Sequence, residues 1–307
     1  MIILPKRIKI TEKYNYNKIK RDINILKFYY EELFVGNIGK SILGEEIKYI
    51  KLGEGRNKIF INAAHHANEC ITSLIAMMFA EKYLELKRQN KTYKGYYIEE
   101  LWEKSSLYIV PMVNPDGVNL CLEEEYVLNN KKYKNIWQEY TEKLHKWKAN
   151  IRGVDLNLNY PSGFEKERKI KYKKGIINPG PLNYGGPNYL SEPETRAIYE
   201  FTKLNKFDLT FLLQLYGREI FCDCNEIKLK KAYELGKKFE NVSGYKLINE
   251  ENKLFFSEYN NWFMSEFKKP SFKIKIGKEK KEEILTAEKI NKFYDEVEEI
   301  FLISLDN

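Results

Sequence analysis

A histidine and a glutamate lie three residues apart, immediately after an apolar segment. Residues 58–64 have the composition of a buried strand, and His66 and Glu69 follow them. The carboxyl ends of strands are where α/β sheets place their ligand sites, and two side chains at this spacing are able to face one zinc ion. A helix-capping glutamate beside a hydrogen-bonded histidine explains the same pair, so the spacing alone does not establish a metal site.

Four further motifs follow in a fixed order along the chain. They read Val113-Asn-Pro-Asp-Gly117, Arg152-Gly-Val-Asp-Leu-Asn-Leu-Asn-Tyr-Pro161, Tyr189-Leu-Ser-Glu-Pro-Glu-Thr195 and Lys269-Pro-Ser-Phe-Lys-Ile-Lys-Ile-Gly277. Together with the His-x-x-Glu motif they resemble the zinc carboxypeptidase family, and within it the bacterial γ-D-glutamyl-diaminopimelate peptidases, which cut cell-wall peptides. The resemblance runs from about residue 40 to the C-terminus.

This resemblance implies a defined hydrolytic chemistry. In that family two histidines and one glutamate hold zinc and leave a position open for water. A separate glutamate is the general base, and the metal lowers the pKa of the water and polarises the scissile carbonyl. An arginine stabilises the oxyanion, an Asn-Arg pair binds the substrate carboxylate, and a tyrosine closes over the substrate. His66 and Glu69 match the first two zinc ligands, and Asn157 matches the asparagine of the carboxylate clamp.

Three positions that the family uses carry residues unsuited to that chemistry. The strand expected to provide the remaining histidine ligand has Gln214 in its place, and an amide oxygen is a poor zinc ligand beside imidazole. The general-base position is Lys275, and a lysine accepts a proton near neutral pH only when its pKa is strongly depressed. Leu158 replaces the arginine of the carboxylate clamp.

Two assignments stay open at this point. Lys148 and Arg152 both lie near the position of the oxyanion arginine. An ungapped comparison places Lys253 at the closing tyrosine, with Tyr259 nearby as a substitute. His65 is expected to point away from the site that His66 enters.

These departures favour a catalytically inactive homologue that binds a peptide, a cell-wall fragment or a protein partner, without a cofactor. The alternative is a zinc-dependent peptidase of altered mechanism that still uses His66 and Glu69. We expect His66, Glu69, Asn157, Gln214 and Lys275 to meet at one edge of the sheet. Without a metal ion, Glu69 needs another cation, and the Lys275 ammonium is predicted to provide it.

The elements around these motifs alternate between strands and helices, which predicts a single α/β domain with a mixed, twisted sheet flanked by helices. Helices are expected at 16–34, 70–88, 192–204 and 286–304, and strands at 46–52, 57–63, 106–113, 208–214, 218–223 and 271–276. Ser191 and Glu194 have the spacing of a capping box. We assign residues 1–40 to a helical lead-in and 41–307 to the domain, with 122–150 as a charged, helical excursion.

Bulk properties fit a folded, non-membrane protein. The chain has 307 residues, 43% hydrophobic content and a net charge of +8. Lys and Glu alternate on helix faces, which is typical of a solvated surface, and no nucleic-acid-binding motif is present. The N-terminus lacks a signal-peptide pattern and no apolar run spans a bilayer, so the expected compartment is the cytoplasm. Cys222 and Cys224 lie two residues apart on an expected strand and so point the same way. We expect two ordinary reduced thiols, and a vicinal thiol site is the alternative.

Overall fold

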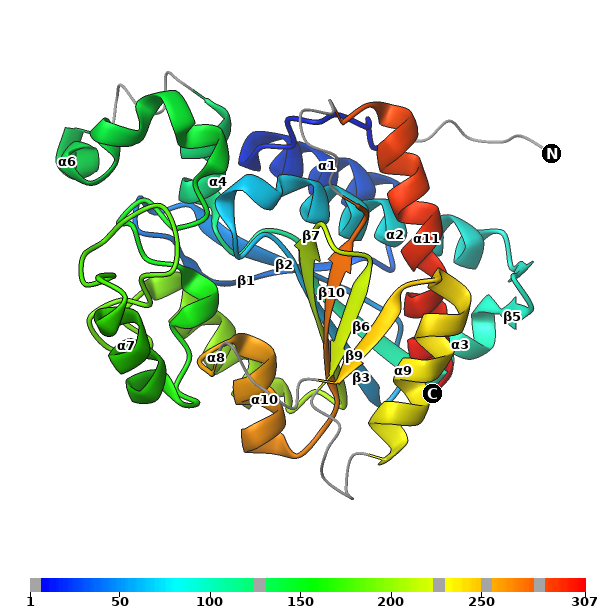
Figure 1. Cartoon of the computed structure of the whole chain (residues 1–307). Coiled ribbons are helices and arrows are strands. Elements are labelled where there is room, and N and C mark those ends of the chain that lie inside the picture. Colours follow the sequence, from blue (N-terminus) through cyan, green and yellow to red (C-terminus); the bar gives the residue numbers. More distant parts are fainter. Residues whose placement is uncertain (1–6, 124–130, 223–229, 250–255, 279–284) are drawn as a thin grey trace.

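An eight-stranded mixed sheet runs through the molecule. The structure is a computed structural model that describes residues 7–123, 131–222, 230–249, 256–278 and 285–307. In spatial order the strands are β1 (Phe34–Lys40), β2 (Glu46–Leu52), β6 (Ser105–Val110), β3 (Asn57–Asn62), β7 (Leu209–Leu215), β10 (Ser271–Ile276), β8 (Glu219–Cys222) and β9 (Lys246–Asn249). The central strands β6, β3, β7 and β10 are parallel, and antiparallel pairings join β1 to β2, β2 to β6 and β10 to β8. Figure 1 shows their strong twist.

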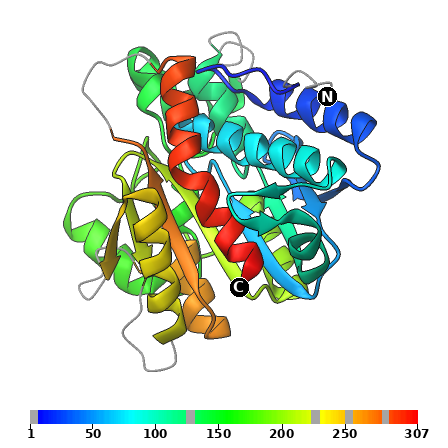
Figure 2. The ribbon, with the colours of Figure 1, turned by 90° about the vertical axis from the view of Figure 1, so that its right-hand side faces the viewer.

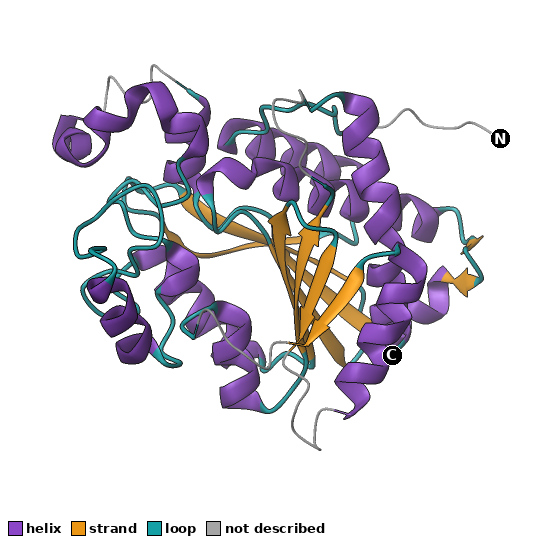
Figure 3. Ribbon diagram, viewed as in Figure 1, coloured by secondary structure: helices purple, strands orange, loops and turns teal. Residues whose placement is uncertain are grey.

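Helices cover both faces of this sheet (Figure 3). One face packs against α1 (Tyr16–Tyr29), α2 (Cys70–Arg88), α3 (Ile98–Lys104), α9 (Lys230–Ser243) and α11 (Ala287–Asp306), which contribute to the larger hydrophobic core. In Figure 2, α11 crosses this face obliquely beside α2 and α9. The other face packs against α8 (Pro193–Asn205) and α10 (Tyr259–Phe267), through a second core rich in aromatic rings. None of the described helices combines the length and the hydropathy needed to span a bilayer.

A third, smaller cluster of buried side chains lies beside the carboxyl ends of the central strands. It joins α4 (Pro115–Leu122) to a run of short helices, namely η2 (Lys131–Tyr133), α6 (Lys134–Trp137) and η3 (Gln138–Lys146), through Trp137, Trp147 and Leu120. The 122–150 excursion is therefore helical from Lys131 to Lys146 and is anchored by Trp137 and Trp147. A small hairpin, β4 (Thr92–Tyr93) with β5 (Tyr96–Tyr97), precedes α3.

Side-chain alternation along the strands sorts the candidate site residues onto one face. Phe272 and Ile274 of β10 enter the larger core. Successive side chains on a strand point to opposite faces, so Lys273 and Lys275 lie on the α8/α10 face. Gln214 of β7 lies on the same face, because its register partner in the parallel β10 strand is Lys275.

The ends of several elements differ from the sequence expectations. The first helix ends at Tyr29, and Phe34–Lys40 forms an edge strand paired with β2, so the 1–40 lead-in is only partly helical and includes part of the sheet. The N-cap of α8 is Glu192 and makes no side-chain cap bond, while Glu194 accepts the Ile42 N–H at 3.1 Å. The capping box was therefore wrong, because the Glu194 carboxylate is bound by a different loop.

The cysteine expectation also fails at one position. Cys222, at the end of β8, is disulfide-bonded. Cys70 and Cys121 are free thiols. Cys224 lies outside the described residues.

Candidate active site

The His-x-x-Glu motif sits on a sharp turn at the carboxyl end of β3. Ala64 adopts a left-handed conformation (φ 48°), which is uncommon for a residue with a Cβ atom and marks a locally constrained backbone. Its N–H donates to Thr72 Oγ1 at 3.0 Å, and the Thr72 hydroxyl donates to the Glu69 carbonyl at 2.7 Å. The turn leads into η1 (Ala67–Glu69) and then α2. These bonds fix the positions from which His66 and Glu69 point inward.

His66 lies between two carboxylates. Its Nδ1 is 3.0 Å from Glu69 Oε1 and its Nε2 is 3.3 Å from Asp155 Oδ1. Burial alone would lower the pKa of His66, but the charges of Glu69 and Asp155 outweigh burial and raise it to about 10. Burial raises the pKa of Asp155, and the adjacent His66 more than offsets this, so that it falls to about 2. The motif and Asp155 therefore bring one imidazole and two carboxylates together at the end of β3.

A lysine from the excursion provides the cation next to Glu69. The Lys148 Nζ is 3.9 Å from Glu69 Oε1. Arg152 points elsewhere: its guanidinium binds the Glu192 carboxylate, with Nη2 to Oε2 at 2.7 Å. Of the two residues left open by the sequence, Lys148 is thus the one beside the His66–Glu69 pair.

Gln214 reaches the same edge of the sheet at the end of β7. The N–H of the next residue, Leu215, donates to Glu69 Oε2 at 3.2 Å, which ties this strand end to the His-x-x-Glu motif. Gln214 is only 6% exposed, and its Nε2 makes no hydrogen bond within the described structure. The side chain that replaces a histidine therefore brings a buried amide donor to this edge.

Lys275 does not neutralise Glu69, and that expectation was wrong. Its Nζ is 3.6 Å from Glu219 Oε2, and its side chain is 31% exposed. The antiparallel β8 strand places Glu219 directly opposite Lys275, and oppositely charged cross-strand neighbours attract each other. Lys275 thus pairs with Glu219 on the adjacent strand. The cation next to Glu69 is Lys148, where Lys275 was predicted.

A buried ion pair that the sequence did not reveal lies beside Asn157. Lys273 Nζ is 2.7 Å from Glu258 Oε2, and both residues are at most 5% exposed. Asn157 Nδ2 donates to Glu258 Oε1 at 3.1 Å. The available signal was Lys273 itself, since a lysine on the site face of a central strand needs a partner. The partner was not predictable because the approach of Glu258 to Lys273 depends on how α10 packs against β10.

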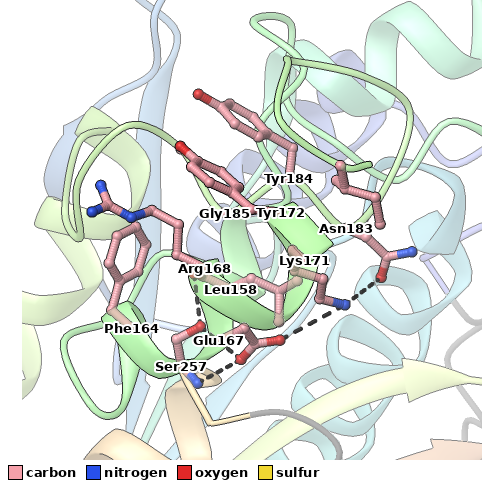
Figure 4. A pocket seen from close by; sticks show the side chains of 12 residues that line it. Leu158, Phe164, Glu167, Arg168, Lys171, Tyr172, Asn183, Tyr184, Gly185 and Ser257 are labelled. Carbon is pink, nitrogen blue, oxygen red and sulfur yellow. Dashed lines mark hydrogen bonds and ion pairs between the residues drawn. The ribbon is translucent and has the colours of Figure 1, made fainter. Parts of the chain in front are cut away.

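Leu158 lines a pocket instead of contacting the Glu258 carboxylate. It belongs to η4 (Leu156–Leu158) and is 3% exposed. The pocket is small, with a cavity volume of about 10 Å³. Its wall is formed by α7 (Phe164–Lys173) and the 183–186 loop, as Figure 4 shows. Glu167 accepts bonds from the N–H and the hydroxyl of Ser257 at 3.0 and 2.9 Å, which holds the segment leading to Glu258.

Tyr259 is a core residue and was wrongly considered as the closing tyrosine. It is fully buried, its ring packs against Tyr160 and Trp262, and its hydroxyl is 3.2 Å from Thr202 Oγ1. Such a side chain is not available to close over a ligand. Lys253, the other alternative, lies outside the described residues.

His65 points away from His66, as expected. Its Nε2 is 2.8 Å from the Tyr160 hydroxyl in the aromatic core. Burial and the nearby His66 lower the pKa of His65 to about 3. His65 is therefore a neutral core residue.

The donor set does not fit the zinc ion of a hydrolytic site. Catalytic zinc is held by three protein ligands and a water molecule. Within the described ranges no group of three His, Cys, Asp or Glu side chains is arranged to hold a metal ion. His66 Nδ1 and Glu69 Oε1 are within hydrogen-bonding distance of each other. The third position offers only the amide of Gln214.

Comparison with known proteins defines the class of this fold and site. The family model described as zinc carboxypeptidase matches residues 23–293, and the chain belongs to that family. The γ-D-glutamyl-L-diamino acid endopeptidase 1 of Lysinibacillus sphaericus is 33% identical over 267 residues, 87% of this chain and 66% of that protein. The protein YqgT of Bacillus subtilis is 29% identical over 286 residues, 89% of this chain and 74% of that protein. The first of these relatives agrees with the branch that the motifs indicated.

Solved structures agree on the fold. Carboxypeptidase A from Helicoverpa armigera superposes with a TM-score of 0.74 at 15% identity, over 97% of this chain and 75% of that chain. The murein-tripeptide amidase MpaA from Escherichia coli O157 superposes with a TM-score of 0.53 at 16% identity, over 85% of this chain and 88% of that chain. At these identities the likeness shows the α/β fold alone.

Proposed function

We propose that this chain is a non-hydrolytic member of the zinc carboxypeptidase family, which binds a peptide, such as a cell-wall peptide, through the edge of the sheet where its relatives carry out catalysis. The proposal rests on the side chains that occupy this edge of the sheet and on their contacts. His66 lies within ion-pair distance of Glu69 and Asp155, and the Lys148 ammonium lies 3.9 Å from Glu69. The base position holds Lys275, which is paired with Glu219.

This arrangement lacks the parts that peptide hydrolysis needs. Activating water takes a metal ion or a base with a suitable pKa, and Gln214 and Lys275 replace residues that would provide them. Lys148 is retained as a cation beside Glu69, in a position to attract a peptide carbonyl or carboxylate. Binding without turnover is the function that this set of side chains supports.

The relatives support the choice of ligand class. The name of the Lysinibacillus protein, which is 33% identical, states endopeptidase activity on γ-D-glutamyl-L-diamino acid bonds. We infer that this chain binds the same class of peptide.

The test combines metal analysis, turnover and binding on one preparation. We expect no stoichiometric zinc by mass spectrometry of the purified protein. We expect no hydrolysis of γ-D-glutamyl-diaminopimelate peptides above background. Binding of those peptides, measured by calorimetry, should be unaffected by a chelator. Stoichiometric zinc together with chelator-sensitive turnover would contradict the proposal.

A second candidate function is a zinc-dependent peptidase of altered mechanism. It is favoured by His66 and Glu69, which are both present, and by Asp155, which contacts the Nε2 of His66. A carboxylate in that place is typical of zinc-binding histidines, where it orients the ring. The same metal and turnover measurements separate the two candidates.

A further inference from the structure

A basic helix and an uncharged segment follow one another in residues 164–191. Helix α7 and its C-cap, residues 164–174, hold six basic and two acidic side chains, a net charge of +4 in a chain whose net charge is +8. Residues 175–191 carry no charged side chain, which makes them the longest such run in a sequence that is 31% charged. Basic and uncharged residues are therefore separated here, whereas Lys and Glu alternate on other helix faces.

The acidic side chains of α7 already have partners. Glu165 Oε2 is 2.6 Å from Arg168 Nη2, and Glu167 accepts bonds from the N–H and the hydroxyl of Ser257. Three exposed lysines of this helix and its C-cap have no acidic partner within the described ranges, namely Lys169, Lys173 and Lys174. Their ammonium groups are thus available to an anionic partner.

Large apolar side chains are exposed next to these lysines. Tyr172 on the helix is 45% exposed, and in the uncharged segment Ile177 is 52%, Leu182 44% and Tyr189 53% exposed. These four make up more than a third of the eleven large hydrophobic side chains that are exposed in the described part of the chain. A single exposed apolar side chain is ordinary, but a group of them indicates a contact surface.

Side-chain contacts join the helix and the uncharged segment into one surface. Lys171 Nζ donates to Asn183 Oδ1 at 3.2 Å, as Figure 4 shows. The rings of Phe164 and Tyr189 meet edge to face, with their centroids 6.1 Å apart. In Figure 1, α7 lies at the periphery of the molecule, far from α9. The lysines and the exposed apolar side chains therefore face solvent together.

We propose that this surface, formed by α7 and residues 175–191 and called the α7 surface below, docks onto an acidic lipid bilayer. The negative potential of acidic headgroups attracts lysines close to the membrane. Isoleucine, leucine and tyrosine side chains partition into the boundary between headgroups and acyl chains. A soluble polyanion would use the lysines but gain little from the exposed isoleucine and leucine, so the combination favours a bilayer. Docking of this kind is independent of the proposed peptide binding, because it uses other side chains.

The first test is co-sedimentation of the full chain with lipid vesicles. We expect binding to vesicles of phosphatidylglycerol and phosphatidylcholine, mixed in a ratio of roughly three to seven, and none to pure phosphatidylcholine. Sodium chloride at about 0.5 M should weaken this binding, because salt screens exposed charges. Equal binding to both kinds of vesicle, or to neither, would overturn the proposal.

A pair of charge-matched variants locates the binding surface. Lys169→Gln/Lys173→Gln/Lys174→Gln should weaken binding to the acidic vesicles about 100-fold, since each lysine near an acidic surface contributes a factor of about five. The control Lys231→Gln/Lys238→Gln/Lys292→Gln removes the same charge from exposed positions on α9 and α11 and should stay within about twofold of wild type. An equal loss in both triple variants would assign the binding to the net charge of the chain and contradict docking through the α7 surface.

A second variant distinguishes a bilayer from a soluble polyanion. Ile177→Ser/Leu182→Ser changes two exposed side chains and keeps every lysine, so the melting temperature should change little. This variant should bind the acidic vesicles about tenfold more weakly than wild type, because apolar area no longer enters the interface. Its binding to inorganic polyphosphate, measured by calorimetry, should equal that of wild type. Unchanged vesicle binding by this variant would show that the lysines alone act, and would make the α7 surface a site for soluble polyanions instead.

Discussion

At the scale of single residues, Lys273 and Lys275 differ in where their acidic partners lie. Lys273 and Lys275 lie on the same strand and face. Lys273 is buried against Glu258, whereas Lys275 pairs with Glu219 near the surface. An exposed ion pair contributes little to stability, but removing one partner of a buried pair leaves an uncompensated charge. The two lysines should therefore respond very differently to the same substitution.

Lys273→Met should destabilise the protein by roughly 3–5 kcal/mol, because the buried Glu258 carboxylate loses the ammonium that lies 2.7 Å from it. Lys275→Met, the matched control, should change the free energy of unfolding by at most about 1 kcal/mol. Urea denaturation of both variants measures the difference. The double variant Lys273→Met/Glu258→Leu should recover most of the loss. Equal effects of the two lysine variants would show that the Lys273–Glu258 pair contributes no more to stability than the exposed Lys275–Glu219 pair.

Glu194 gives a prediction about pH. Burial, together with the charges of Asp116 and Glu192, raises the pKa of Glu194 to about 8. The folded protein therefore keeps this proton while the unfolded chain releases it near its ordinary pKa. This contribution to stability is complete below that ordinary pKa and is lost as the pH rises toward 8. Glu194→Gln should match wild type at pH 5 and be more stable at pH 8, by roughly 1–3 kcal/mol.

The measurement is the melting temperature of wild type and Glu194→Gln across that pH range. Glu288→Gln, at an exposed position in the first turn of α11, is the control and should run parallel to wild type. A Glu194→Gln curve parallel to wild type would show that the carboxyl ionises normally in the folded state.

At the scale of elements, the spacing of apolar residues along the sequence was sufficient to predict most of the helices and strands. The α2 helix spans the predicted residues, and strands at 46–52 and 271–276 match because apolar alternation and turn residues bound them. The end of the first helix was missed because Phe34–Lys40 is an exposed edge strand, which carries little apolar alternation. The directions of Lys275 and Tyr259 were missed because they depend on β8 and on the aromatic core, which are distant in sequence.

The first helix tests whether the lead-in belongs to the domain. Leu26 is fully buried in the larger core, whereas Phe28 on the same helix is 81% exposed. Leu26→Ala should cost roughly 2–5 kcal/mol of stability, as large-to-small core substitutions do. Phe28→Ala should stay within about 0.5 kcal/mol. Chemical denaturation followed by a core-strand probe is the measurement, and a small effect of Leu26→Ala would make the helix a separate unit.

At the scale of the whole molecule, the larger hydrophobic core and the candidate site lie on opposite faces of the same strands. On β10, Phe272 and Ile274 build the larger core while Lys273 and Lys275 face the site. Residues on the site face can therefore change without disturbing the larger core. This separation explains how a chain with Gln214 and Lys275 keeps the carboxypeptidase fold, with a TM-score of 0.74 to a carboxypeptidase A. It also explains why the fold was predictable from motif order while the site contacts were not.

If the frame is intact, the metal site should be restorable by side chains alone. Gln214→His/Lys275→Glu adds a third ligand of a type that zinc prefers and removes a cation from the site face. We expect the double variant to bind stoichiometric zinc and to melt at a higher temperature when zinc is added, because a ligand that binds only the folded state stabilises it. Lys275→Glu alone should do neither, since only His66 and Glu69 would remain as ligands. Mass spectrometry and thermal melting with and without zinc are the measurements. A double variant that folds but takes up no zinc would show that Lys148 and the contacts between His66, Glu69 and Asp155 have closed the site, and that the loss of metal binding extends beyond the two substituted positions.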